Sequence, residues 1–441
     1  MLEKLFKLTE NRTTVRTELI AGATTFMTMA YIVVVNPQTL ASPVGANMDF
    51  NAVMAATCIG AAVGTLLMAF LANYPIALAP GLGLNAYFSY VICGQMGVPW
   101  QIALGIVFLS GVLFTILTVL RVREMIVNAI PAPLKLATAA GIGLFIAFIG
   151  LKDAGVVEAS PATFVTLGNL RYPPTLLAIF GLIVTAALMA ARVKGAIFWG
   201  ILVTGLAGIV TGLVRFTGVF GLPSMTPTFM KMRPLAALRF EYLVPIIVLL
   251  FFDMFDTVGT LIGVGEQAGF MKDGKLPRVN QALVSDSIAT MAGAPLGTSN
   301  VTSYIESAAG VSAGGRTGLA NVFTAGLFLV ALFFTPLVQM FGGGFESGSG
   351  VILHPITAPA LIIVGCLMMK CIARIDWSEY SDAIPAFLTM LVMPLTFSIA
   401  HGLAIGFISY PVVKALSGRA REVHWLVYAL AALFVLRYVL I

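Results

Sequence analysis

Long apolar runs fill nearly the whole of this 441-residue chain. A helix needs about 20 apolar residues to cross the hydrocarbon core of a bilayer. Hydrophobic residues make up 59% of the sequence and charged residues 10%, whereas soluble domains carry about 25% charged residues. Too few polar residues remain to coat a water-soluble surface. The sequence therefore predicts an all-α polytopic membrane protein with no room for an ordinary soluble domain.

The apolar runs set the expected segments of the chain. We predict thirteen uninterrupted spans, at residues 18–35, 52–71, 100–120, 136–151, 175–191, 196–214, 242–264, 282–291, 319–341, 352–369, 383–399, 401–416 and 425–440. Two further apolar stretches, 74–90 and 293–310, are interrupted by proline, glycine and central polar residues. The total is fourteen segments if 383–399 and 401–416 form one broken unit.

The two interrupted stretches match each other about half a chain length apart. They read YPIALAPGLGLNAYFSY and GAPLGTSNVTSYIESAAG, and Ala79-Pro80 precedes Asn85 by the same interval as Ala294-Pro295 precedes Asn300. Unpaired backbone is prohibitive in lipid, so broken backbone survives only inside protein or beside a wet cavity. Matched breaks in two halves of a chain are typical of a transporter binding site. The alternative is that they only kink two packed helices.

Charge and cysteine patterns exclude several functions. The net charge is +6, and the basic residues are scattered rather than clustered, which indicates membrane-flanking side chains and no nucleic-acid partner. The four cysteines have no histidine at zinc-ligand spacing, and no hydrolase or metalloprotease motif occurs, so we expect no metal, no cofactor and no enzyme. Lys4, Lys7, Arg12 and Arg16 precede the first span and favour a cytoplasmic N-terminus.

Acids inside apolar runs are the sharpest functional signal. Even low estimates put the cost of a charge at mid-bilayer at about 2.5–3.5 kcal/mol, so such groups face the protein interior and usually serve transport. Asp253 and Asp256 lie three residues apart in VLLFFDMFDTVGTLIGVG, a spacing that places both on roughly one helix face. Glu306 lies in the second interrupted stretch and Asp286 in a short apolar segment. Each could instead cap or pair within the core.

Amides and aromatic rings complete the candidate site. Asn85 and Asn300 each offer a donor and an acceptor, which suits a planar ligand with a mixed edge. Capping of the broken backbone is their alternative role. Aromatic side chains are available for stacking on such a ligand, although packing is the commoner use of aromatic rings in spans. They are Phe26, Tyr87, Phe88 and Phe255.

Four motifs resemble one known family. GATTFMTMAYIVVVNP, APGLGLNAYFSY, FFDMFDTVGTLIGVGEQAG and GTSNVTSYIESAAGVSAGGRTG are similar to the AzgA-like branch of the nucleobase–cation symporter-2 family, which contains adenine, guanine and hypoxanthine permeases. The resemblance spans essentially the whole chain. It implies fourteen segments in two inverted repeats of seven, with segments 3 and 10 interrupted. It also implies a core domain at 1–120 and 240–344 and a gate domain at 121–239 and 345–441.

The resemblance also implies roles for single residues. Asp253 matches the substrate-binding acid of segment 8, Glu306 the segment-10 carboxylate that contacts the base, and Asn85 the polar residue of segment 3. Asp256 matches a nearby acid important for transport, and Asp286 a segment-9 acid of relatives. Uracil-type relatives carry a histidine or other group where this chain has Thr257, so Asp256 is the expected proton-coupling residue.

The expected function is secondary active import of hypoxanthine, guanine and adenine by proton symport through alternating access. The protein would lie in a bacterial inner membrane, with lipid around it and a homodimer through the gate domain. Three rival interpretations stay open: an anion transporter of the sulfate-permease type, a channel, and a membrane-embedded enzyme. An anion site would tolerate acids badly.

Overall fold

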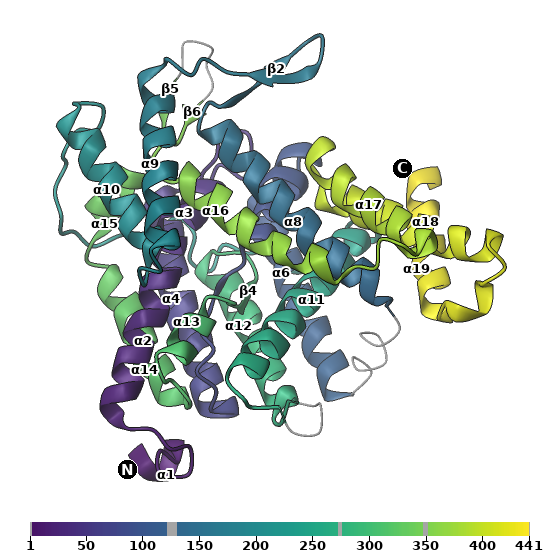
Figure 1. The fold of residues 1–441 in the computed structure, drawn as a ribbon, viewed down its shortest axis with the longest axis horizontal. Helices are drawn as coiled ribbons and strands as arrows, with labels where there is room; N and C mark the ends of the chain where they lie inside the picture. The colour runs from purple at the N-terminus through teal and green to yellow at the C-terminus, as the bar shows by residue number, and fades with distance from the viewer. Residues whose placement is uncertain (1, 121–129, 272–275, 347–351, 441) are drawn as a thin grey trace. The chain divides into compact units, whose positions relative to one another are not determined.

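The computed structural model describes residues 2–120, 130–271, 276–346 and 352–440, and within them the chain is predominantly helical (Figure 1). The helices of the first part are α1 (Leu2–Phe6), α2 (Val15–Met29), α3 (Ile32–Leu40), α4 (Phe50–Leu67), α5 (Leu82–Ala86), α6 (Trp100–Val119), α8 (Ala132–Asp153), α9 (Pro173–Ala190) and α10 (Ala196–Val210). Two π-helical stretches, Met68–Ala72 and Tyr87–Gln95, continue α4 and α5.

The second part begins with a 3-10 turn at Phe240–Tyr242 that leads into α11. Its helices are α11 (Leu243–Gln267), α12 (Val279–Leu296), α13 (Ser307–Ser312), α14 (Gly318–Ala331), α15 (Thr335–Gly342), α16 (Ala358–Met368), α17 (Tyr380–Leu395), α18 (Ile399–Leu416) and α19 (Trp425–Leu440). Short 3-10 helices lie at Met369–Arg374 and Ala420–Glu422. The strands are β1 (Leu78–Pro80), β2 (Val157–Ser160), β3 (Phe164–Leu167), β4 (Val301–Ser303), β5 (Phe345–Glu346) and β6 (Ile352–Leu353).

Seven helical stretches among the described residues are long and apolar enough to cross a membrane. They are Val15–Leu40, Phe50–Ala72, Trp100–Val119, Ala132–Asp153, Pro173–Ala190, Phe240–Gln267 and Ile399–Leu416. Four shorter apolar helices add to them, at Ala196–Val210, Gly318–Ala331, Tyr380–Leu395 and Trp425–Leu436. The prediction of an all-α polytopic membrane protein is confirmed, whereas the count of fourteen segments stays a prediction.

Several predicted segments were wrong in extent. The runs 18–35 and 319–341 are each two helices, because the chain breaks between α2 and α3 and again between α14 and α15. The run 282–291 is the middle of a much longer helix, α12. The runs 383–399 and 401–416 form separate helices, because Phe397 takes a left-handed backbone conformation with φ 50°. Ser398 then caps the start of α18.

The two interrupted stretches meet as an antiparallel strand pair, β1 with β4, in which Ala79 lies opposite Thr302. Their backbone continues to pair beyond the strands, where Gly81 N donates to Asn300 O over 3.0 Å and Tyr304 N donates to Ala77 O over 3.0 Å. A short helix follows each strand, α5 after β1 and α13 after β4. The predicted breaks are therefore confirmed, and each satisfies the backbone of the other.

The residue match between the two stretches was wrong. Ala79-Pro80 lies in β1, whereas Ala294-Pro295 lies in the last turn of α12. Asn85 lies in α5, after its strand, whereas Asn300 immediately precedes β4. The equal spacing in the sequence thus aligned a helix end with a strand, and Asn85 and Asn300 occupy different positions in the two broken segments.

The described chain forms two compact units. Unit 1 comprises Met1–Val119 and Asp153–Ala360, and unit 2 comprises Leu120–Lys152 and Leu361–Ile441. In unit 1, α4 packs against α3, α12 and α14, while α12 also packs against α6. Both ranges predicted for the core domain fall in unit 1 apart from Leu120. The division into core and gate domains stays a prediction.

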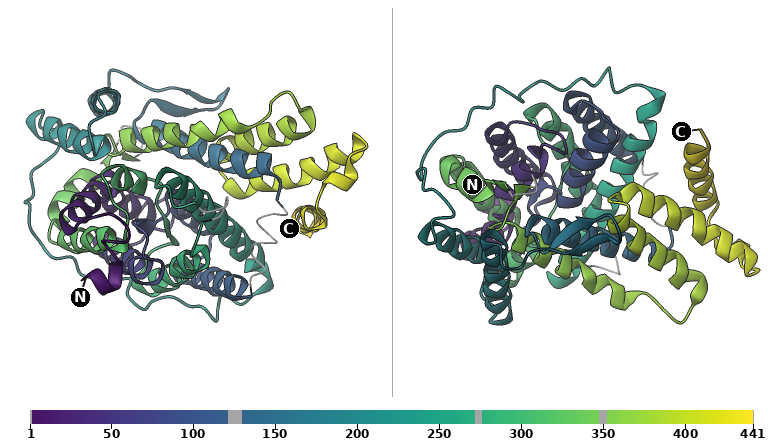
Figure 2. Two further views of the ribbon diagram at one scale, coloured as in Figure 1. Left: turned by 60° about the horizontal axis from the view of Figure 1, so that its bottom comes forward. Right: turned by 90° about the horizontal axis from the view of Figure 1, so that it is seen from above.

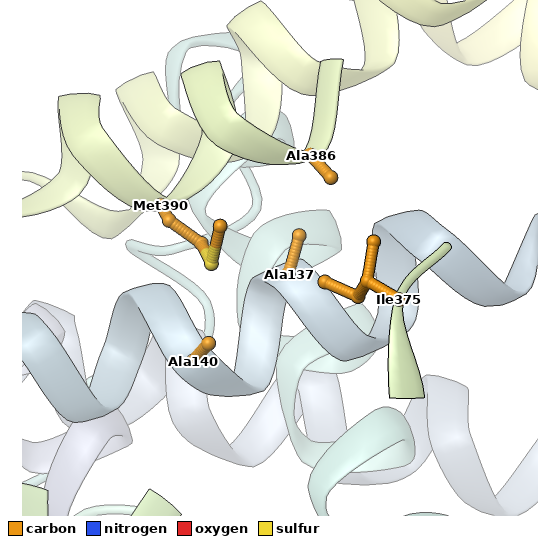
Figure 3. Packing of buried hydrophobic residues seen from close by; sticks show 5 residues of the cluster. All are labelled: Ala137, Ala140, Ile375, Ala386 and Met390. Atoms are coloured by element: carbon orange, nitrogen blue, oxygen red, sulfur yellow. The ribbon is translucent and has the colours of Figure 1, made fainter. Parts of the chain in front are cut away.

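Unit 2 is built on the helical hairpin of α17 and α18, which run side by side in two views (Figure 2). Gly402 faces Met393 and Gly406 faces Thr389, so the two helices approach closely in antiparallel directions at small residues, as is common between membrane helices. Ala137 and Ala140 of α8 pack against Ala386 and Met390 of α17 and against Ile375 (Figure 3).

In unit 1, α2 packs tightly on α14. A Cβ atom at Gly22 would collide with the carbonyl oxygen of Ala320, so only glycine permits this approach. Glu18 of α2 is fully buried, and its carboxyl oxygens accept backbone N–H groups at the start of α14: Arg316 at 2.9 Å, Thr317 at 3.4 Å and Ala320 at 3.1 Å. A carboxylate at a helix N-terminus satisfies orphan donors and complements the helix dipole.

Glu18→Ala is therefore expected to destabilise the fold by about 2–3 kcal/mol, because three buried N–H groups lose a charged acceptor. The midpoint of heat inactivation in detergent should fall by about 2–3 °C, measured as the monodisperse fraction after heating. The matched control is Glu10→Ala, which removes an exposed ion pair with Lys7 and should change the midpoint little. Equal midpoints for the two variants would contradict this role of Glu18.

Candidate functional site

All four predicted acids of the spans lie in unit 1, around the crossing of β1 and β4. Asp253 and Asp256 come from the middle of α11, Asp286 from α12, and Glu306 from the residue that precedes α13. They divide by exposure. Asp253 and Asp286 are fully buried, at 1% and 0%, whereas Asp256 and Glu306 are half-buried.

The deeper Asp253 meets the predicted amide Asn300. Asn300 Nδ2 donates to Asp253 Oδ2 over 2.9 Å, and Thr290 Oγ1 of α12 donates to the same oxygen over 3.1 Å. The amide also lies 3.3 Å from Ser110 Oγ of α6. Asp253 Oδ1 and Asn300 Oδ1 are buried without a hydrogen-bond partner among the described residues. Two acceptor atoms at this point are thus free to bind a donor.

Asp286 is held by hydroxyl groups. Thr257 Oγ1 donates to Asp286 Oδ1 over 2.9 Å, and Ser303 Oγ of β4 donates to the same oxygen over 3.3 Å. The second oxygen, Oδ2, is buried and has no partner among the described residues. Asp253 lies close enough to Asp286 for the two charges to act on each other.

The two half-buried acids, Asp256 and Glu306, lie beside two tyrosines. Tyr31, in the break between α2 and α3, donates its hydroxyl to Glu306 Oε1 over 2.6 Å. Asp256 lies near enough to Glu306 for mutual repulsion, and Tyr304 lies near both acids. Tyr304 in turn donates its hydroxyl to the carbonyl oxygen of Pro80.

The predicted amide Asn85 joins a second network, also fully buried. Asn85 Nδ2 donates to Asn36 Oδ1 over 3.0 Å, and Asn36 Nδ2 donates to Thr57 Oγ1 over 2.7 Å and to Thr298 Oγ1 over 2.9 Å. Asn85 Oδ1 is buried with no partner among the described residues. No hydrogen bond in the described chain joins Asn85 to any of the four acids. Thr298 lies two residues before Asn300, so the two networks meet in the segment that leads into β4.

The aromatic candidates are dispersed. Phe26 packs edge-on against Phe328, with ring centroids 5.2 Å apart, and lines an apolar cavity of about 230 Å³ that Tyr31 also borders. Phe255 stacks on Phe251 of the same helix at 5.9 Å. Phe88 is fully buried. Stacking on a ligand stays a prediction for each of these three rings.

No cation balances the four acids within the described chain. Their hydrogen bonds come from asparagine, threonine, serine and tyrosine, and no lysine, arginine or histidine of the described residues bonds to any of them. The charges that act on them are those of one another. Four carboxyl groups at such spacing in a low dielectric repel when ionised. The site is therefore suited to bind protons or neutral ligands rich in N–H donors, and poorly suited to an anion.

Sequence reasoning missed five residues that hydrogen-bond to the candidate acids or amides: Tyr31, Asn36, Ser110, Thr290 and Ser303. Tyr31 and Asn36 lie inside the apolar run 18–35 or at its end, where polar groups are costly in lipid. This cost could have identified Asn36 as a residue of the site. Single threonines and serines are common in spans and satisfy themselves on the preceding turn, so they gave no comparable signal.

A helical membrane protein with two broken segments crossing at buried acids has the architecture of a carrier. A family model described as the "Permease family" (Xan_ur_permease) matches residues 16–405. The chain belongs to this family, the nucleobase–cation symporter-2 permeases, and is a transporter rather than an enzyme.

Named relatives match over the full length. The guanine/hypoxanthine permease PbuG of Bacillus subtilis is 46% identical, over 99% of this chain and 99% of its own. The adenine permease AdeQ of Escherichia coli is 42% identical, over 100% of this chain and 96% of its own. These relatives confirm the resemblance to the adenine, guanine and hypoxanthine permeases.

A solved structure confirms the fold. The transmembrane domain of the cyanobacterial bicarbonate transporter BicA superposes with a TM-score of 0.64 at 15% identity, over 89% of this chain and 97% of that domain. At this identity the similarity concerns the fold alone. The fold is therefore shared with an anion carrier, and the cargo must be argued from the site.

Proposed function

We propose that the protein imports purine nucleobases, namely hypoxanthine, guanine and adenine, by proton symport through alternating access. One observation carries the proposal: Asp253, Asp256, Asp286 and Glu306 gather at the crossing of the two broken segments, where no basic side chain of the described residues bonds to them. Relatives over the full length are named as guanine/hypoxanthine and adenine permeases. A purine is flat and neutral, and its N–H groups suit carboxylate acceptors.

The resemblance to the family suggests the role of each acid. Glu306 and Asp253 accept N–H groups of the base, and Asn85 and Asn300 offer amide groups to its mixed edge. Asp256 and Asp286 take up the coupling proton, since protonation removes repulsion within the cluster. One proton that enters down a membrane potential contributes about 2.3 kcal/mol per 100 mV, which suffices to drive accumulation.

The remaining features belong to the same proposal. The core domain, 1–120 with 240–344, moves against the gate domain, 121–239 with 345–441, and two copies associate through the gate. The protein lies in the bacterial inner membrane with its N-terminus in the cytoplasm. Basic residues before the first span, Lys4 and Lys7 among them, support this orientation.

The test is uptake by purified protein in proteoliposomes. Radiolabelled hypoxanthine, guanine, adenine, xanthine and uracil are offered with an inward proton gradient, with an inward sodium gradient, and with neither. We expect accumulation of the first three bases under the proton gradient only, and faster uptake when unlabelled base is preloaded, which distinguishes a carrier from a channel. Accumulation of bicarbonate or sulfate but of no base would overturn the proposal in favour of an anion carrier.

A further inference from the structure

Two threonine hydroxyls connect the buried acids. Thr257 Oγ1 lies 2.9 Å from Asp286 Oδ1 and 2.7 Å from Thr302 Oγ1 of β4. Both threonines are fully buried, at 0% and 1% exposure. The Thr302 hydroxyl also lies beside the carboxyl groups of Asp253 and Asp256. A row of neighbouring oxygen atoms thus leads from the fully buried Asp286 through Thr257 and Thr302 to the carboxyl groups of Asp253 and Asp256.

This row accommodates either of two directions of hydrogen bonding. A hydroxyl has one proton to donate and two lone pairs to accept with. When Asp286 is ionised, Thr257 donates to it and must accept from Thr302. When Asp286 carries a proton, it donates to Thr257, Thr257 donates to Thr302, and Thr302 donates to the carboxylate of Asp256. The oxygen atoms need not move between these two states.

We infer that Thr257 and Thr302 relay a proton between Asp256 and Asp286, so that the coupling proton is stored on a fully buried carboxyl group. The inference rests on the proposed proton symport. In the inward step, the Asp256 carboxyl proton passes to Thr302 Oγ1, the Thr302 proton to Thr257 Oγ1, and the Thr257 proton to Asp286 Oδ1. Asp256 ends as a carboxylate, Asp286 as a carboxylic acid, and both threonines as neutral hydroxyls.

The groups that face the two ends of the row favour transfer of a single proton. Asp286 faces Asp253 and Asp256 of α11 and the Ser303 hydroxyl of β4. Asp256 faces Asp253 on its own helix and Glu306 before α13. No basic side chain of the described residues bonds to either end. A proton is therefore the one cation that the row itself can carry, and its position decides which end bears the negative charge.

A threonine cannot hold a proton at ordinary pH, but it can pass one on between neighbours that can. The group that holds the proton at this end of the row is the carboxyl group of Asp286, whose Oδ1 lies 2.9 Å from Thr257 Oγ1.

The test compares isosteric and conservative variants in proteoliposomes. Thr257→Val removes the hydroxyl at nearly constant shape, and Thr257→Ser keeps it; Thr302→Val and Thr302→Ser form a second pair. Three quantities are measured: guanine accumulation under an inward proton gradient, guanine exchange at equal pH on both sides, and proton entry on guanine addition, followed with an internal pH dye. Guanine binding in detergent reports whether each variant folds.

We expect both valine variants to lose accumulation and proton entry by at least about 10-fold, the lower range for a lost proton-transfer group, while exchange and binding stay near wild type. Both serine variants should recover accumulation. Valine variants that accumulate guanine like wild type would overturn the relay, as would serine variants as defective as valine. Equal loss of exchange and accumulation in the valine variants would assign the threonines to packing instead. A wild-type protein that exchanges guanine but never accumulates it would overturn the symport proposal itself.

Discussion

Asp253→Asn is expected to lower gradient-driven guanine accumulation by about 100-fold or more, because charge-assisted hydrogen bonds contribute about 1.5–3 kcal/mol each and the amide removes the charge from every hydrogen bond that Asp253 accepts. Asp253 Oδ2 accepts from Asn300 and Thr290, while Oδ1 has no partner among the described residues. An amide in its place can turn an N–H group towards Asn300 Nδ2, which sets donor against donor. In the other orientation its carbonyl group still accepts from Asn300 and Thr290, and its N–H group points where Oδ1 would accept from the base.

The matched control removes a neutral hydrogen bond of Asn300 and keeps the charge of Asp253. Ser110→Ala removes the hydroxyl 3.3 Å from Asn300 Nδ2, and the amide keeps its shorter bond to Asp253. A neutral hydrogen bond contributes about 0.5–1.5 kcal/mol, so accumulation should fall by no more than about 10-fold. Uptake rates and guanine binding in detergent are measured for both variants. An Asp253→Asn protein that folds and accumulates guanine within a few-fold of wild type would remove Asp253 from the site.

The sequence predicted well those features whose placement in lipid would cost much free energy, namely buried acids and broken backbone. Charged groups are expensive in lipid, so Asp253, Asp286 and Glu306 stood out from their apolar surroundings, and the structure places all three around one strand crossing. Proline and glycine in the two interrupted stretches predicted broken backbone there. Those predictions needed only local sequence and the low tolerance of a bilayer for unpaired polar groups.

Helix breaks without proline or glycine could not be predicted in this way. The chain breaks at Ala30 and Tyr31, which carry no helix-breaking signal, and α3 then continues through Pro37. The break places the Tyr31 hydroxyl on Glu306, a residue 275 positions away. Such a position is decided by tertiary contacts, which override local propensity. Only the later break, before Pro336 at the start of α15, had a local signal.

The pairing of distant segments was equally out of reach. The antiparallel register of β1 with β4 sets Ala79 opposite Thr302, whereas matching intervals in the sequence had aligned Ala79 with Ala294. The equal intervals set the two stretches at the wrong offset, because a helix begins shortly after Pro80 whereas a helix ends shortly after Pro295. The contacts of Thr302 with Thr257 follow from that register and could be seen only in three dimensions.

The second large effect is expected at Glu306. Its half-buried carboxyl group accepts the Tyr31 hydroxyl at Oε1 over 2.6 Å, which fixes the group and leaves Oε2 for a ligand. Guanine offers two adjacent donors, the ring N–H and the exocyclic amine, to a carboxylate. Glu306→Gln should weaken guanine binding by about 10- to 150-fold, the equivalent of one charge-assisted hydrogen bond. The measurement is a binding isotherm with purified protein in detergent.

Adenine provides the discriminating comparison for Glu306. It lacks the ring N–H next to its amine and presents a ring nitrogen acceptor there, so an amide can pair with it by one donor and one acceptor. Glu306→Gln should therefore weaken adenine binding less than guanine binding. Glu266→Gln, at the exposed end of α11, is the matched control and should bind both bases like wild type.

Tyr31→Phe removes only the hydrogen bond that orients Glu306 and should weaken guanine binding by about 2- to 12-fold. If Glu306→Gln weakened both bases equally, the carboxyl group would act through the shape of the site and not by accepting from the base.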